Sequence, residues 1–296
     1  MEFALGAAFF YAWFVTCARR SSAHHGPDLA NLGRLVVALV AVGAFVALSD
    51  RHPFCAGWGW LVLGGVLGLG VGDIALFHAL PRIGVGLTML LTQCLAAPFA
   101  LVLEYETLGH APTGAQMAAS LVILTGVGFA LGAPAEGDPA HRKAGVWLGV
   151  LSALGQACGA VSAPLTVHAC EAAAQTVPDG FSQAFVRLLG GAPVVAAFLL
   201  WSSREAGLLA KVRRPYVWTG AAGWMLMNGL SGPALGVACY QWALTSQPAA
   251  LVLSVVALTP VIGLVMQWAV EGRRPAGRLW LGGAVAVAGV VLLRRA

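Results

Sequence analysis

Apolar segments of about twenty residues recur along the whole chain, and they set the strongest limit on what it can fold into. A helix of about 20 apolar residues spans the ~30 Å hydrocarbon core of a bilayer. Only 10% of the 296 residues are charged, against about 25% in a soluble domain, and the mean hydropathy is +0.81. The sequence therefore predicts an all-α, multi-pass integral membrane protein of the cell (inner or plasma) membrane.

Ten such runs predict ten transmembrane helices, which are separated by short connections rich in Gly, Pro and charged residues. The longest polar connection, "APAEGDPAHRK" at 133–143, divides the chain into a first five-helix repeat at 1–132 and a second five-helix repeat at 144–296. The predicted spans are 3–18, 31–48, 57–79, 84–103, 114–132, 144–164, 183–201, 216–241, 247–269 and 276–293.

The two halves match each other at nearly fixed offsets. Thr92 and Pro98 of the first half correspond, at one common offset, to Ser254 and Pro260 of the second. With five spans in each repeat, the second half enters the membrane upside down, so the two halves form inverted repeats. This architecture is typical of secondary transporters, whose substrate site lies near the midplane and whose alternating access comes from rocking one half against the other.

Further motifs recur in both halves. Arg34 and Arg187 each open the second span of a half, an Ala-Leu pair closes each third span, and the fifth spans are rich in Gly ("ASLVILTGVGFAL", "GGAVAVAGVVLL"). Together with the Pro of each fourth span, this pattern resembles the EamA-type transporters of the drug/metabolite transporter superfamily. "GDIALFHAL" is similar to a "GD…F…AL" pattern of some members. The resemblance covers nearly the whole chain and implies a ten-helix bundle that moves small metabolites such as amino acids.

The chain departs from the family pattern in one place. Family members often carry Gly-Glu-Arg after the fourth span, whereas this chain reads "LEYETLGH" there, without Arg. The stretch "VEGRRP" at 270–275, in the second half, resembles that motif better.

The distribution of basic residues bears on orientation. Most Lys and Arg residues lie on the odd-numbered connections, which the positive-inside rule assigns to the cytoplasm, with both termini outside. The family resemblance implies the reverse orientation, with both termini inside. Both orientations stay open, but an even number of spans places the two termini on the same side.

Asp73 differs from the other eleven of the chain's 12 acidic residues, because it alone lies well inside a predicted span. An acidic residue near the centre of a membrane helix costs on the order of 2.5–3.5 kcal/mol on insertion scales. Such residues usually mark substrate or ion paths. Asp73 would then exchange a proton or bind an ammonium group, although a structural hydrogen bond to a neighbouring span is an equal alternative. Its counterpart in the second half is about Val237, and this asymmetry favours function.

Other polar residues within the spans are also candidates. His78 could relay protons or lie at the interface, and Arg34 and Arg187 could bind a carboxylate or anchor helix ends. Prolines that break helices at matching positions point to a transport site, and buried amides and aromatic rings could contact a substrate. The remaining substrate- and ion-path candidates are Tyr11, Trp13, Thr92, Gln93, Pro98, Gln156, Asn228, Tyr240, Gln241, Ser254 and Pro260.

Several kinds of chemistry leave no signature in the sequence. It contains no GxxxxGK[ST] phosphate-binding loop, no HExxH motif and no cluster of ligands with metal spacing. The six Cys include no CxxC pair and fit apolar packing. The scattered basic residues form no patch for nucleic acid. We therefore expect no cofactor or metal, and the lipid bilayer and a small-molecule substrate as partners, with a monomer and a homodimer both open.

These observations predict a secondary transporter, and not an enzyme. It would export small metabolites such as amino acids by alternating access, with proton coupling through Asp73. The alternative is a membrane enzyme that acts on a lipid-linked substrate. That function requires a second acid or base near Asp73, and His78 is the nearest candidate in the sequence.

Overall fold

The structure, a computed structural model, describes residues 2–109, 111–133, 139–204, 221–246, 252, 255–256, 258–272 and 274–295. All regular elements in these ranges are helical. They are α1 (Glu2–His25), α2 (Pro27–Leu48), α3 (Trp58–Gly64), η1 (Gly65–Gly72), α4 (Asp73–Leu108), α5 (Gly114–Leu131), η2 (Pro139–His141), α6 (Arg142–Ala172), α7 (Gly180–Ser202), α9 (Ala221–Gly229), η4 (Leu230–Gly236), α10 (Val237–Ser246), α12 (Thr259–Glu271) and α13 (Gly277–Arg295).

Among the described residues, five helical segments are long and apolar enough to cross a membrane. They are Pro27–Leu48, Trp58–Thr107, Gly114–Leu131, Arg142–Ala172 and Gly180–Ser202, and shorter apolar helices lie at Thr259–Val270 and Gly277–Leu293. The fold is therefore an all-helical one with several apolar helices of membrane-spanning length.

The long segment Trp58–Thr107 contains the predicted third and fourth spans in one continuous run. A break occurs within it at Gly84, whose φ of 75° and ψ of 169° are not helical. Glycine adopts a positive φ without the steric penalty of a Cβ atom. The predicted fourth span begins at this residue.

Several helices extend past their predicted ends. α1 continues to His25 and α6 to Ala172, whereas hydropathy alone placed these ends at 18 and 164. Backbone hydrogen bonds decide where a helix ends, and they continue through polar residues that hydropathy assigns to a connection. α6 also continues through Pro164.

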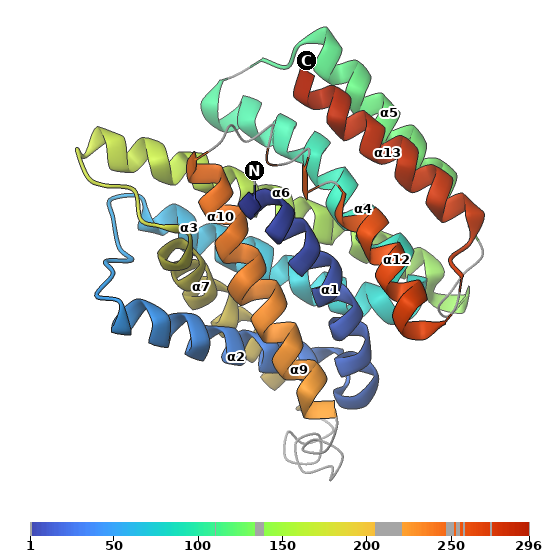
Figure 1. Cartoon of the computed structure of the whole chain (residues 1–296), viewed down its shortest axis with the longest axis horizontal. Coiled ribbons are helices and arrows are strands. Elements are labelled where there is room, and N and C mark those ends of the chain that lie inside the picture. Colours follow the sequence, from blue (N-terminus) through green and yellow to red (C-terminus); the bar gives the residue numbers. More distant parts are fainter. Residues whose placement is uncertain are drawn as a thin grey trace.

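Helices of the two halves pack against each other in corresponding pairs. α2 lies along α7, and α5 lies along α13. α1 contacts α9, η4 and α10, while α3 and η1 contact α6. α1 also contacts α12, and α4 contacts α6. Figure 1 shows the α5–α13 pair, in green and red, along one edge of the molecule.

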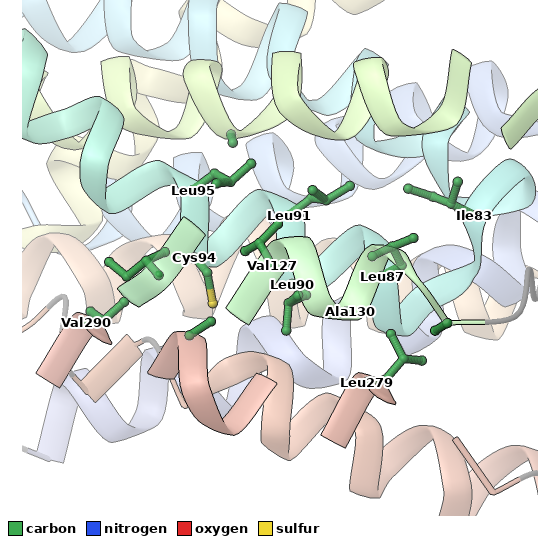
Figure 2. Packing of buried hydrophobic residues seen from close by; sticks show 14 of the residues in the cluster. Ile83, Leu87, Leu90, Leu91, Cys94, Leu95, Val127, Ala130, Leu279 and Val290 are labelled. Carbon is green, nitrogen blue, oxygen red and sulfur yellow. The ribbon is translucent and has the colours of Figure 1, made fainter. Parts of the chain in front are cut away.

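A hydrophobic cluster ties α4 to the α5–α13 pair. Leu87, Leu90 and Cys94 of α4 meet Val127 of α5 and Leu279 of α13 (Figure 2). Each of these side chains is buried. Burial of this apolar surface contributes roughly 25 cal/mol per Å² where the alternative is contact with water.

The α5–α13 contact depends on a glycine. A Cβ atom at Gly126 would lie 2.5 Å from the backbone nitrogen of Ala286, whereas one at Gly128 would meet nothing within 4 Å. We expect Gly126→Ala to lower the free energy of unfolding by about 1–3 kcal/mol through overpacking. Gly128→Ala is the matched control. It should leave the free energy of unfolding unchanged or raise it by up to about 1 kcal/mol, because Ala has the higher helix propensity. Unfolding of both variants in mixed micelles tests the prediction, and equal effects would contradict it.

The carboxylate of Asp179 caps the start of α7. It accepts hydrogen bonds from the backbone nitrogens of Phe181 (2.9 Å) and Ser182 (3.3 Å), and it pairs with Arg51 at 2.8 Å. Partial burial alone would raise the pKa of this carboxyl, but the hydrogen bonds from Arg51, Ser182 and Phe181 outweigh burial and lower it.

Because the folded-state pKa of Asp179 is lowered, its stabilisation is present above the ordinary carboxyl pKa and is lost as pH falls through the lowered value. We expect Asp179→Ala to cost about 0.5–2 kcal/mol at neutral pH and to flatten the loss of stability in acid. Unfolding measured between neutral pH and acid checks this. A variant as acid-sensitive as the wild type would show that other carboxyl groups dominate.

Candidate functional site

Two π-helical segments occupy corresponding places in the two halves. η1 ends next to Asp73, and η4 ends next to Val237, the two positions that the sequence comparison equates. π-helical turns within α-helices are frequent at functional sites. The structure thus places the same irregularity in both halves, with an acid in one and an apolar residue in the other.

Asp73 forms a buried ion pair with Arg34. Nη2 of Arg34 donates to Oδ2 of Asp73, and the two side chains are 2% and 3% exposed. Nε of Arg34 donates to Oδ1 of Asn31 at 3.0 Å. The guanidinium also lies over the rings of Phe14 and Phe77, at 5.0 and 4.9 Å from their centroids. Arg34 is therefore held inside the bundle and does not anchor a helix end at the surface.

Arg187 is the counterpart of Arg34 in the second half, and it is equally buried. Within the described part of the chain, its side chain forms no hydrogen bond or ion pair, and its Nε is buried without a partner. A Cβ atom at Gly159 would lie 2.3 Å from Nη2 of Arg187, and one at Gly68 would lie 3.3 Å from it. Glycines on two neighbouring elements therefore make room for this guanidinium.

Both arginines line a cavity between the two halves. Its volume is about 50 Å³, room for a few waters and less than the ~300–1,000 Å³ of drug-sized ligand pockets. A metabolite therefore fits only if the surrounding helices move apart. The polar and charged side chains that line the cavity are Tyr11, Arg34, Asp73 and Gln93 from the first half and Gln156, Arg187 and Tyr240 from the second.

His78 does not pair with Asp73. Its Nε2 lies 2.7 Å from Oδ1 of Asp28, and Oδ2 of Asp28 accepts a hydrogen bond from the hydroxyl of Ser202 at 2.7 Å. This cluster joins α4 to α2 and α7, and His78 does not line the cavity. The second acid or base that a membrane enzyme needs beside Asp73 is therefore not supplied by His78.

Residues 2–132 and 144–295 each match the EamA-like transporter family, and together they cover nearly the whole chain. This chain belongs to the EamA-like transporter family. The EamA resemblance of the sequence is thus confirmed, and the chain is a member of a family of membrane transporters.

Solved structures agree on the fold of this EamA-like protein. Of 26 matching chains, one crystal structure covers 98% of this chain and 94% of its own, with a TM-score of 0.62 and 19% sequence identity. At that identity the likeness shows the fold alone. Among curated proteins, none matches the chain.

Several other candidates of this EamA-like chain, among the residues that the structure describes, do not line the cavity. Thr92 donates to the hydroxyl of Ser152 at 3.4 Å, and Asn228 donates to the hydroxyl of Ser21 at 3.1 Å. Each of these bonds joins a helix of one half to a helix of the other. Thr92 and Asn228 thus have partners within the protein.

Four further candidates can be placed and one cannot. Both amide atoms of Gln241 are buried without a hydrogen-bond partner. Trp13 contacts Trp224 with ring centroids 6.4 Å apart. Pro98 does not break its helix as predicted, because α4 continues through it to Leu108 and has its non-helical residue at Gly84, whereas Pro260 lies in the first turn of α12. Ser254 falls outside the described residues.

The sequence alone did not identify the surroundings of Arg34. Asn31 precedes it by one helical turn, a spacing at which side chains meet, so the sequence spacing indicates this contact. Nothing in the sequence indicates the contacts with Phe14 and Phe77, because single aromatic residues are common in apolar spans. The π-helical segments were signalled only by clusters of Gly, such as "GVLGLGVG" at 65–72.

Proposed function

We propose that this chain is a secondary transporter that exports small metabolites such as amino acids across the cell membrane. The observation that carries the proposal is the buried cavity, which is lined by charged and polar side chains from both halves. Ionisable residues inside a membrane bundle are costly and mark substrate or ion pathways. A site between the halves is also where alternating access requires it.

The proposal includes ten transmembrane helices in two inverted repeats, at 1–132 and 144–296. The packing supports it, because a twofold relation pairs α2 with α7 and α5 with α13. α1 contacts α9, η4 and α10, and α6 contacts α3 and η1. The same twofold relation maps the first set of contacts onto the second. The corresponding positions of η1 and η4 fit the same relation.

Asp73 is the proposed coupling group. Proton binding to its carboxylate would remove the negative charge that holds Arg34 and would weaken the ion pair. An ammonium group of the substrate would compete with the proton for the same carboxylate. That competition supports exchange of a proton for an amine-bearing substrate, which is the form of coupling that export requires.

The test is transport by the purified full-length protein in proteoliposomes. We would measure uptake of a labelled panel of amino acids and small metabolites, with and without an imposed pH gradient. Wild type should move at least one compound above protein-free liposomes, and a pH gradient should accelerate it. Failure to move any member of the panel would overturn the proposed substrate class.

A blocked cavity provides the control. Ala160 of α6 lines the cavity, whereas Ala144 of the same helix is exposed. Because the cavity holds only a few waters, the ring in Ala160→Phe should fill it and reduce uptake to the protein-free background. Ala144→Phe should transport like wild type. If Ala160→Phe folds, as judged by size-exclusion chromatography, and still transports, the substrate path lies elsewhere.

A further inference from the structure

The two halves of the cavity carry different charge balances. In the first half, the positive charge of Arg34 is matched by the carboxylate of Asp73. In the second half, Arg187 is buried in the same cavity, but the position that corresponds to Asp73 is Val237. Among the described residues that line the cavity, one positive charge therefore has no matching acid.

An unmatched buried charge is unfavourable unless a partner satisfies it. Nε of Arg187 is shielded from solvent and has no hydrogen-bond partner. No described carboxylate forms an ion pair with its guanidinium, and the acid that shares the cavity, Asp73, is paired with Arg34. An anionic group from outside the protein would balance this charge.

Further hydrogen-bond donors line the same cavity. Tyr240, which is buried, and Tyr11, which is partly buried, line the cavity together with Arg187, and their ring centroids are 6.1 Å apart. Gln156 of α6 completes the set. None of these three side chains forms a hydrogen bond with another residue in the described part of the chain. Two hydroxyls and an amide are thus available to an oxygen-bearing group at Arg187.

We propose that Arg187 binds a carboxylate group of the transported compound, with the hydroxyls of Tyr11 and Tyr240 as additional donors. The planar guanidinium matches a carboxylate through two parallel hydrogen bonds. The proposal rests on the proposed transport function and deepens it by naming the charged group of the substrate. In an amino acid, the ammonium group would face Asp73 while the carboxylate faces Arg187, so one zwitterion would satisfy both halves of the cavity.

Binding to the purified full-length protein in nanodiscs tests this directly. We would titrate the L-amino acids and simple monocarboxylates, each against its own carboxamide, and measure thermal stabilisation and Kd. Chloride and inorganic phosphate form a separate arm, because they would reveal a general anion site. We expect carboxylates to bind at least tenfold more tightly than their carboxamides.

Two variants remove the proposed site in different ways. Arg187→Gln deletes the cation, and Val237→Asp supplies the missing acid while it keeps Arg187 in place. Each should weaken carboxylate binding roughly ten- to a hundredfold. Arg278→Gln, which removes an exposed cation, is the control and should leave Kd unchanged.

The outcomes separate this proposal from the transport function. Carboxamides that bind as tightly as carboxylates, or an Arg187→Gln variant with wild-type Kd, would overturn it while transport in proteoliposomes still stood. Equal stabilisation by chloride, phosphate and carboxylates would overturn the carboxylate assignment in favour of a general anion site. An absence of transport for every compound would instead overturn the proposed function. Because Val237→Asp retains Arg187, the test does not depend on the folding of Arg187→Gln.

Discussion

Replacing Arg34 with Gln is expected to destabilise the folded protein by about 3–5 kcal/mol, because it leaves the carboxylate of Asp73 buried without its partner. The two side chains are almost fully enclosed, so bulk solvent does not reach the carboxylate that loses its guanidinium partner. Contacts of the cation with the rings of Phe14 and Phe77 are also lost, each worth about 0.5–2 kcal/mol. The free energy of unfolding in mixed micelles measures the effect.

Two further variants show whether the loss comes from the orphaned acid. Arg34→Gln/Asp73→Asn removes both charges and should recover most of the stability lost in Arg34→Gln. Arg187→Gln is the matched control at the corresponding position. Because Arg187 has no acidic partner among the described residues, its removal leaves no buried charge behind, and we expect a neutral or stabilising effect. Equal losses in Arg34→Gln and Arg187→Gln would contradict the asymmetry of the cavity.

The helical class and the family could be predicted from the sequence, because both depend on local patterns. Apolar runs of about twenty residues constrain the backbone to helices. The break at Gly84 coincides with a predicted boundary, because an unusual backbone angle there requires a residue without a Cβ atom. The exact helix ends depend on hydrogen bonding and not on hydropathy, which is why α1 and α6 extend past their predicted ends.

The partners of the candidate residues could not be predicted in the same way. Asp73 was singled out by its position in an apolar span, but its partner Arg34 lies 39 residues away on another helix. His78 follows Asp73 by five residues in the sequence, yet it pairs with Asp28. Both pairs depend on how the helices turn toward one another, and a single sequence with only weak amphipathic patterning does not specify that rotation.

The internal repeat held information about the cavity that the individual residues did not. It equates Arg34 with Arg187 and Asp73 with Val237, and all four residues line one cavity. The missing acid at Val237 was visible in the sequence, but its consequence for Arg187 was not. That consequence required the structure, which shows that the second arginine is also buried and has no partner of its own in the described residues.

Asp73→Asn is expected to abolish the stimulation of transport by a pH gradient. The amide has nearly the shape of the carboxylate, and its oxygen can still accept a hydrogen bond from Arg34, but it cannot take up and release a proton. Transport by wild type should accelerate several-fold under the gradient, and transport by the variant should be the same with and without it. The measurement is initial uptake in proteoliposomes at matched protein content.

Asp50→Asn is the control for loss of a carboxylate outside the cavity. Asp50 is exposed between α2 and α3 and has a positive φ of 49°, a conformation that Asn also tolerates. This variant should keep the full response to the pH gradient. If Asp50→Asn loses the response as well, the effect reports on surface charge and not on the cavity.

Competition between a proton and a substrate ammonium group at Asp73 also predicts how substrate binding depends on pH. If a proton and a substrate ammonium group bind the same carboxylate, lowering the pH on the side that faces the substrate should weaken substrate binding to wild type. The same change in pH should leave substrate binding to Asp73→Asn unaltered. If transport by Asp73→Asn still responds to the gradient, the proton binds at another residue, and the role of Asp73 is to hold Arg34. Because Asp73 is the only carboxylate that lines the cavity within the described residues, that outcome would also remove the cavity from the proton path.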